Sequence, residues 1–161
     1  MLALDRRESD ALPVTPAGFA VAARLQAQVF GFPDMRFGRV KIADWLAGGI
    51  VGRSRIKPRD VRGFVYAPAA DAPARELLIG CAPLPEPYEM ALRVWVVAMA
   101  MCDPSLTKHA CELAMLRLVN SLKPNGPSQL QTVHAIRCEA AWLRDAVVQL
   151  SIRPVFDHSA H

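Results

Sequence analysis

The apolar positions near the C-terminus recur at helical spacing. They step by three or four residues, as in Val133, Ile136, Ala140, Leu143, Val147 and Leu150. Ser128 can cap the first turn, and Arg153-Pro154 stands just beyond the last apolar position. The pattern predicts a helix of about 23 residues between Ser128 and Arg153.

A second long helix is predicted before it, beginning at Asp103-Pro104 and ending at Lys123-Pro124. One apolar face holds Cys111, Ala114, Met115, Leu118, Val119 and Leu122, whereas Leu106, Leu113 and Leu116 lie on roughly the opposite side. The two C-terminal helices are expected to pack antiparallel across the short turn between them. Because one face is enough for the domain's own core, the candidate partner interface is Leu106, Leu113, Leu116 and Trp142.

The segment from Ala91 to Cys102 fits two structures, because it is apolar on every face. Its valines favour a buried strand, and its alanines and methionines favour a helix; the strand is the preferred interpretation. Before it, VRGFVYAP and ELLIGCAP are runs of strand-forming residues joined by AADAPAR. They predict a small β element at about 61–82, arranged as a hairpin or as a pair of edge strands.

Two helices are predicted in the N-terminal third. The first is capped by Thr15, starts at Pro16 and stops at Gly31, and the second runs from Phe37 or Gly38 to Ala47. GRSRIKPRD then predicts an exposed basic loop. The expected fold class is α+β and mainly helical, with a tail at 1–12, one domain at 13–153 and a second tail at 154–161.

Composition supports a folded protein, since 52% of the 161 residues are hydrophobic and 21% are charged. The N-terminus, MLALDRRESD, carries charges where a signal peptide needs its apolar run, and no stretch approaches the roughly 20 apolar residues of a membrane span. Cys81, Cys102, Cys111 and Cys138 lack close spacing. These features predict a cytoplasmic protein with reduced thiols and no membrane contact.

Charge is distributed unevenly along the chain. Residues 36–62 hold eight basic and two acidic side chains, a net +6 within a chain whose total is +4. The candidate polyanion-binding residues are Arg53, Arg55, Lys57, Arg59 and Arg62. Nucleic acid is one polyanion that such a segment could bind, although few aromatic residues lie between the cations.

Signatures of catalysis are weak in this sequence. Gly48 to Ser54 lacks the spacing of a phosphate-binding P-loop, and His134 with Cys138 falls short of a zinc ligand set. Asp157-His158-Ser159 lie near the end of the chain, where catalytic geometry is hard to hold. We therefore assign no catalytic, cofactor-binding or metal-binding residue and expect no cofactor.

The order of the predicted elements is similar to that of acyltransferases of the GNAT type. The resemblance is in topology alone, because Asp103-Pro104-Ser105-Leu106-Thr107 replaces the Gly-containing pyrophosphate loop of that family. A small transferase-like enzyme is the alternative hypothesis. The preferred one is a non-catalytic assembly subunit that binds copies of itself or other proteins through apolar helix faces, with its basic loop facing nucleic acid or another polyanion.

Overall fold

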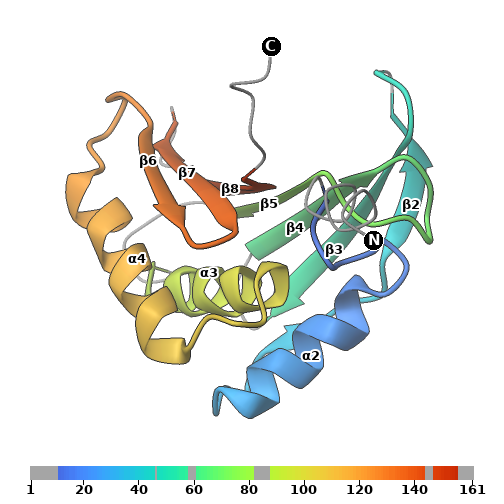
Figure 1. The fold of residues 1–161 in the computed structure, drawn as a ribbon, viewed down its shortest axis with the longest axis horizontal. Coiled ribbons are helices and arrows are strands. Elements are labelled where there is room, and N and C mark those ends of the chain that lie inside the picture. Colours follow the sequence, from blue (N-terminus) through green and yellow to red (C-terminus); the bar gives the residue numbers. More distant parts are fainter. Residues whose placement is uncertain (1–10, 46, 58–60, 82–87, 144–146, 156–161) are drawn as a thin grey trace, which may run out of the picture.

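The protein is an antiparallel β-sheet with helices against one of its faces (Figure 1). The computed structural model describes residues 11–45, 47–57, 61–81, 88–143 and 147–155. Within these ranges the helices are α2 (Phe19–Val29), α3 (Tyr88–Cys102) and α4 (Lys108–Ser121). The strands are β1 (Arg36–Phe37), β2 (Lys41–Asp44), β3 (Ile50–Lys57), β4 (Val61–Ala67), β5 (Glu76–Cys81), β6 (Gln129–Val133), β7 (Ile136–Trp142) and β8 (Val148–Pro154).

The eight strands form one sheet in the order β1-β3-β4-β5-β8-β7-β6, with β2 also paired to β3. β5 pairs with β8, so the C-terminal strands join the earlier ones at the middle of the sheet. Alternate residues of the central strands point to the helices and are buried, as in Leu77, Ile79, Leu150 and Ile152. The other face of these strands carries no described helix, and we call it the open face.

The prediction of a mainly helical fold is wrong, and its largest error is the C-terminal helix. Residues 129–133, 136–142 and 148–154 form the strands β6, β7 and β8 instead. Ile136, Cys138 and Ala140 alternate with exposed residues, which is the period of a half-buried strand. The helical spacing arose because steps of four residues also keep a strand residue on the same face, as Ile136 and Ala140 do.

The preference for a strand at 91–102 is also wrong, because this segment lies in α3. Every residue from Val94 to Cys102 is buried. α3 contacts α2, α4, β5 and β8, so neighbours cover it on several sides. A helix enclosed in this way has no polar face, and its sequence loses the helical period.

The second N-terminal helix and the basic loop are wrong as well. β1 and β2 lie where the helix was predicted, and β3 covers the predicted loop as far as Lys57, whereas residues 58–60 of that loop lie outside the described residues. Gly48 and Gly49 have φ of +96° and +82° and make the turn between β2 and β3 rather than the end of a helix. At Gly49 an added Cβ would lie 2.6 Å from the carbonyl oxygen of Ala67, so the turn also needs glycine for space.

Other elements follow the sequence more closely. β4 and β5 pair antiparallel from Val61 to Cys81, which confirms the predicted hairpin. α2 lies inside the predicted helix that starts at Pro16, and α4 lies inside the one predicted to begin at Asp103-Pro104. Both start later than predicted. Thr107 caps α4 by accepting a hydrogen bond from the backbone N–H of Ala110 at 3.1 Å, so the helix begins after the predicted start at Asp103-Pro104.

Candidate polyanion-binding cleft

Basic side chains alternate with buried ones along β3. Arg53, Arg55 and Lys57 are exposed on the open face, whereas Ser54 and Ile56 are buried on the helix side. This alternation follows from the pleat of a strand, in which successive side chains point to opposite faces. Three cations therefore stand in one row, two residues apart along the strand.

A β-bulge in the edge strand adds a fourth cation to this face. Gly38 stands opposite Arg55 and donates its backbone N–H to the Arg55 carbonyl at 2.8 Å, but Lys41 pairs with Arg53. Residues 39 and 40 thus both lie opposite the single residue Ser54. Because the edge strand has one extra residue here, the side chains that follow point to the other side of the sheet than they would without the bulge. Ser54 Oγ donates to the Gly38 carbonyl at 2.8 Å, which stabilises the bulge and brings Lys41 beside Arg53.

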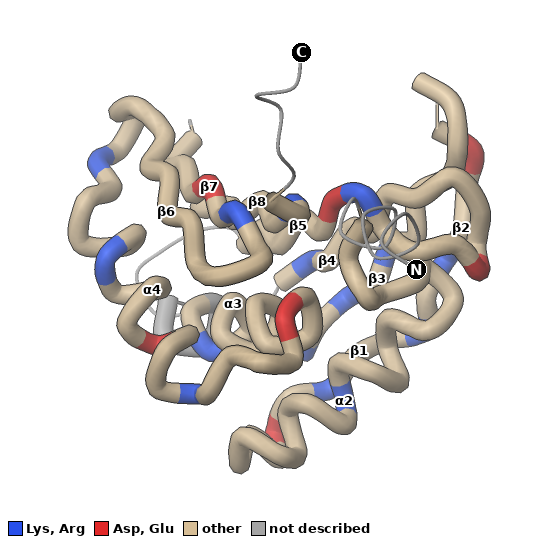
Figure 2. Tube along the Cα trace, in the orientation of Figure 1, with Lys and Arg blue, Asp and Glu red and all other residues tan. Residues whose placement is uncertain are grey.

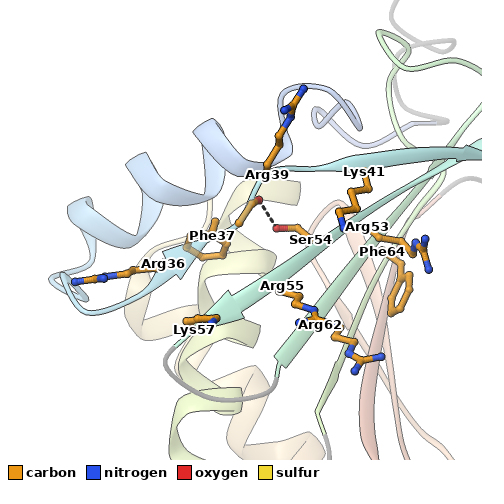
Figure 3. A pocket seen from close by; sticks show the side chains of 11 residues that line it. Arg36, Phe37, Arg39, Lys41, Arg53, Ser54, Arg55, Lys57, Arg62 and Phe64 are labelled. Atoms are coloured by element: carbon orange, nitrogen blue, oxygen red, sulfur yellow. Dashed lines mark hydrogen bonds between the residues drawn. The ribbon is translucent and has the colours of Figure 1, made fainter.

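The resulting hollow, which we call the basic cleft, has a volume of 530 Å³. Its described lining is Arg36, Phe37, Gly38, Arg39, Lys41, Arg53, Ser54, Arg55, Lys57, Arg62 and Phe64. Seven of these residues are basic and none is acidic. Lys and Arg positions recur along β3 and β4 in the tube view (Figure 2), and the close view shows Lys41, Arg53, Arg55, Arg62 and Phe64 grouped together (Figure 3).

Three pairs of like charge lie directly across strands in the basic cleft. They are Arg36 with Lys57, Lys41 with Arg53, and Arg55 with Arg62. Opposed like charges destabilise a sheet, by up to about 1 kcal/mol a pair relative to neutral residues. The cleft therefore concentrates positive potential at a cost to the stability of the free protein, and an anion bound there would relieve the repulsion.

A comparable pair elsewhere on the sheet has a carboxylate beside it. Arg137 stands opposite Arg153 on β7 and β8, and the Arg153 guanidinium donates to the Glu76 carboxylate. Ser151 Oγ donates to the same carboxylate oxygen at 3.0 Å. This end of the open face is thus internally neutralised, whereas no acidic residue occurs among the described residues that line the basic cleft.

The structure brings together most of the predicted polyanion-binding residues. Arg53, Arg55, Lys57 and Arg62 line one cleft, and Arg59 lies outside the described residues. The predicted basic segment 36–62 included Lys41, but sequence reasoning did not place Lys41 and Phe64 on one face with these cations. The alternation of Arg53, Arg55 and Lys57 with uncharged residues was the signal that could have identified a strand with one basic face.

The candidate interface residues divide into two groups. Leu113 and Leu116 on α4 are 41% and 45% exposed. Leu106 and Trp142 are partly buried and pack against the hydrophobic core. The second apolar side of α4 is therefore reduced to two exposed leucines.

The four cysteines are free and buried. Burial raises the pKa of each thiol, to about 11 for Cys111 and about 12 for Cys138. A thiol needs its deprotonated form to act as a nucleophile or to bind a metal, so these side chains are inert at neutral pH. Among the described residues, no group of three or more His, Cys, Asp or Glu side chains could hold a metal ion.

Asp103 joins the loop after α3 to the turn between β6 and β7. Its buried carboxylate accepts hydrogen bonds from Ser105 Oγ at 2.6 Å and from His134 Nδ1 at 2.7 Å, and from the backbone N–H groups of Ser105 and Ala135, each at 3.1 Å. Ser105 Oγ lies 3.2 Å from the same Nδ1. In a catalytic triad the serine and the acid bind opposite ring nitrogens, so this arrangement holds the fold together rather than activating Ser105.

We expect Asp103 to make stability depend on pH. Burial raises the pKa of this carboxyl, but the hydrogen bonds from Ser105 and His134 outweigh burial and hold it below its ordinary value. The stabilisation is therefore complete above the unfolded-state pKa of about 3.9 and is lost as pH falls through the lower folded-state pKa. Asp103→Asn should cost about 1–3 kcal/mol in urea unfolding at about pH 7 and clearly less at about pH 3.

Asp34→Asn is the matched control, because this carboxylate is exposed, and it should change the free energy of unfolding by under about 0.5 kcal/mol. An Asp103→Asn deficit of equal size at both pH values would contradict the role given to the ionised carboxylate.

Comparison with models of protein families, with curated proteins and with solved structures finds no match. The similarity in element order to GNAT-type acyltransferases included a strand at 91–102, and this segment is helical. In the described part of the chain no helix has both the length and the apolar character that crossing a membrane requires.

Proposed function

We propose that the protein binds a phosphate-rich polyanion in the basic cleft. The observation that carries this proposal is the opposition of like charges in the pairs Arg36–Lys57 and Lys41–Arg53, in a hollow with no acidic residue in its described lining. Repulsion of this kind weakens the free sheet, and a polyanion converts it into attraction. The side chains are exposed, so phosphate groups reach them without any rearrangement of the backbone.

The proposal is tested by the salt dependence of binding. Inorganic polyphosphate titrated into the protein by calorimetry should bind with a slope of log affinity against log salt of about −3 to −4. This value follows if each of five cations displaces one counterion, because each such contact contributes about 0.7 to the slope. The five are Lys41, Arg53, Arg55, Lys57 and Arg62. Absence of binding, or an affinity that does not respond to salt, would overturn the proposal.

Self-assembly is the second candidate function, and it has a separate observation in its favour. Val21, Leu25 and Val29 recur every four residues along α2 and are 59%, 58% and 77% exposed. Together with Leu113 and Leu116 they leave apolar positions on two helices open to a partner chain. Sedimentation velocity over a range of protein concentrations tests this function, and a strict monomer at every concentration would count against it.

A further inference from the structure

We infer that the polyanion is a single-stranded nucleic acid, with a base stacked on Phe64. This inference rests on the proposed function and adds the class of ligand. Phe64 is an aromatic side chain on the open face of β4, directly opposite Arg53 of β3. In the close view its ring stands among the cations of the basic cleft (Figure 3).

The position of Phe64 is informative because the hydrophobic core of the protein does not require an aromatic side chain there. The helix-facing side of β4 already provides Val61 and Val65, which are fully buried. Phe64 is only partly buried and belongs to the opposite face. An aromatic ring beside cations offers a base a flat apolar surface and offers the adjoining phosphates positive charge.

A second aromatic site continues along the same face. Tyr66 follows Phe64 by two residues, which places the two side chains about 6.7 Å apart along the strand. Trp45, at the end of β2, packs edge-on against Tyr66 with ring centres 5.2 Å apart, and it is 45% exposed. Aromatic residues therefore extend from the basic cleft toward the β2–β3 turn, in a direction that an extended strand of nucleotides can follow.

Stacking distinguishes single strands from the other polyanions. Polyphosphate has no bases, and a duplex keeps the faces of its bases inside the stack, so neither gains from Phe64. A single strand exposes its bases and can use the ring and the cations together. The aromatic component should therefore appear as affinity that depends on bases and not on charge.

The test compares four ligands by fluorescence anisotropy, of which the single-stranded and the abasic oligomer are matched in charge. We would use a labelled single-stranded thymidine oligomer of about 12 nucleotides, an abasic oligomer of the same length, a duplex of the same length, and inorganic polyphosphate. Phe64→Leu should weaken binding of the thymidine oligomer about 5- to 150-fold and leave polyphosphate binding unchanged. Phe64→Tyr keeps an aromatic face and should restore the affinity for the oligomer.

The outcomes separate the inference from the proposed function. If Phe64→Leu binds the thymidine oligomer as the natural protein does, or if the abasic oligomer binds equally well, the inference is overturned and polyanion binding stands. If Phe64→Leu weakens duplex binding as much as it weakens binding of the thymidine oligomer, the inference is also overturned. If none of the four ligands binds, both are overturned. Unchanged polyphosphate affinity in Phe64→Leu also shows that the variant keeps the folded cleft.

Discussion

Replacing Arg53, Arg55 and Lys57 together by glutamine is expected to weaken polyanion binding about 100-fold at about 0.1 M salt. Each of these exposed side chains lines the basic cleft, and each contact with a phosphate contributes about 0.7 to the salt slope. Three lost contacts thus remove about two logarithmic units of affinity and make the slope shallower by about 2. Titration with polyphosphate at several salt concentrations measures both quantities.

The same variant should be at least as stable as the natural protein. Each replacement removes one member of an opposed like-charge pair. The three pairs are Lys41 with Arg53, Arg55 with Arg62, and Arg36 with Lys57. We expect a gain of a few tenths to about 1 kcal/mol in the free energy of unfolding, measured in urea. Lost binding combined with retained or raised stability would separate a functional cluster from a structural one.

The matched control removes the same net charge elsewhere. Arg24 on α2, Arg117 on α4 and Lys123 after α4 are exposed and do not line the basic cleft. Their joint replacement by glutamine should change polyanion affinity only slightly, through the total charge of the protein. Equal losses in the two triple variants would mean that net charge, and not the basic cleft, carries the binding.

The sequence identified the cations of this site but not their arrangement. A basic segment that includes Arg53, Arg55 and Lys57 was recognised in the sequence. Because a loop was predicted there, the sequence did not show that these side chains form a row on one face of β3. Their period of two was readable in the sequence. The place of Lys41 was not, because it depends on the extra residue between Gly38 and Lys41, which appears only in the pairing with β3.

The pairing of Phe64 was equally hidden. Its position opposite Arg53 is set by the register between β3 and β4, and a shift of one residue would have moved it to the helix side. The sequence shows no short hairpin signature between these strands, since Pro58-Arg59-Asp60 contains neither an Asn-Gly nor an Asp-Gly pair. Long-range register of this kind is decided by packing across the whole sheet.

Two of the errors in the predicted fold fall where apolar periodicity is ambiguous. In β7 and β8 the buried alternate residues coincide with steps of four, and the turn at His134, with φ of +52°, lacks the glycine that marks a hairpin. In α3 the burial of all sides removes the polar face that distinguishes a helix. Both errors come from reading one element alone, when its neighbours determine which faces are buried.

Trp95→Ala is expected to lower the free energy of unfolding by about 3–5 kcal/mol. Trp95 lies within α3 and has no exposed surface, so truncation leaves a cavity between this helix and its neighbours. A domain of ordinary stability has about 5–15 kcal/mol in total, so the variant should unfold at a much lower urea concentration. Chemical unfolding followed by circular dichroism measures the loss.

Trp45→Ala is the matched control, because the same side chain is removed from a site that is 45% exposed. It loses an edge-on contact with Tyr66 and should cost about 1 kcal/mol. Trp95→Phe keeps most of the ring and removes an indole N–H that has no hydrogen-bond partner within the described residues, so it should cost less than Trp95→Ala. Similar losses for Trp95→Ala and Trp45→Ala would contradict the packing of α3 at the centre of the core, because burial of α3 is what makes the two tryptophans unequal.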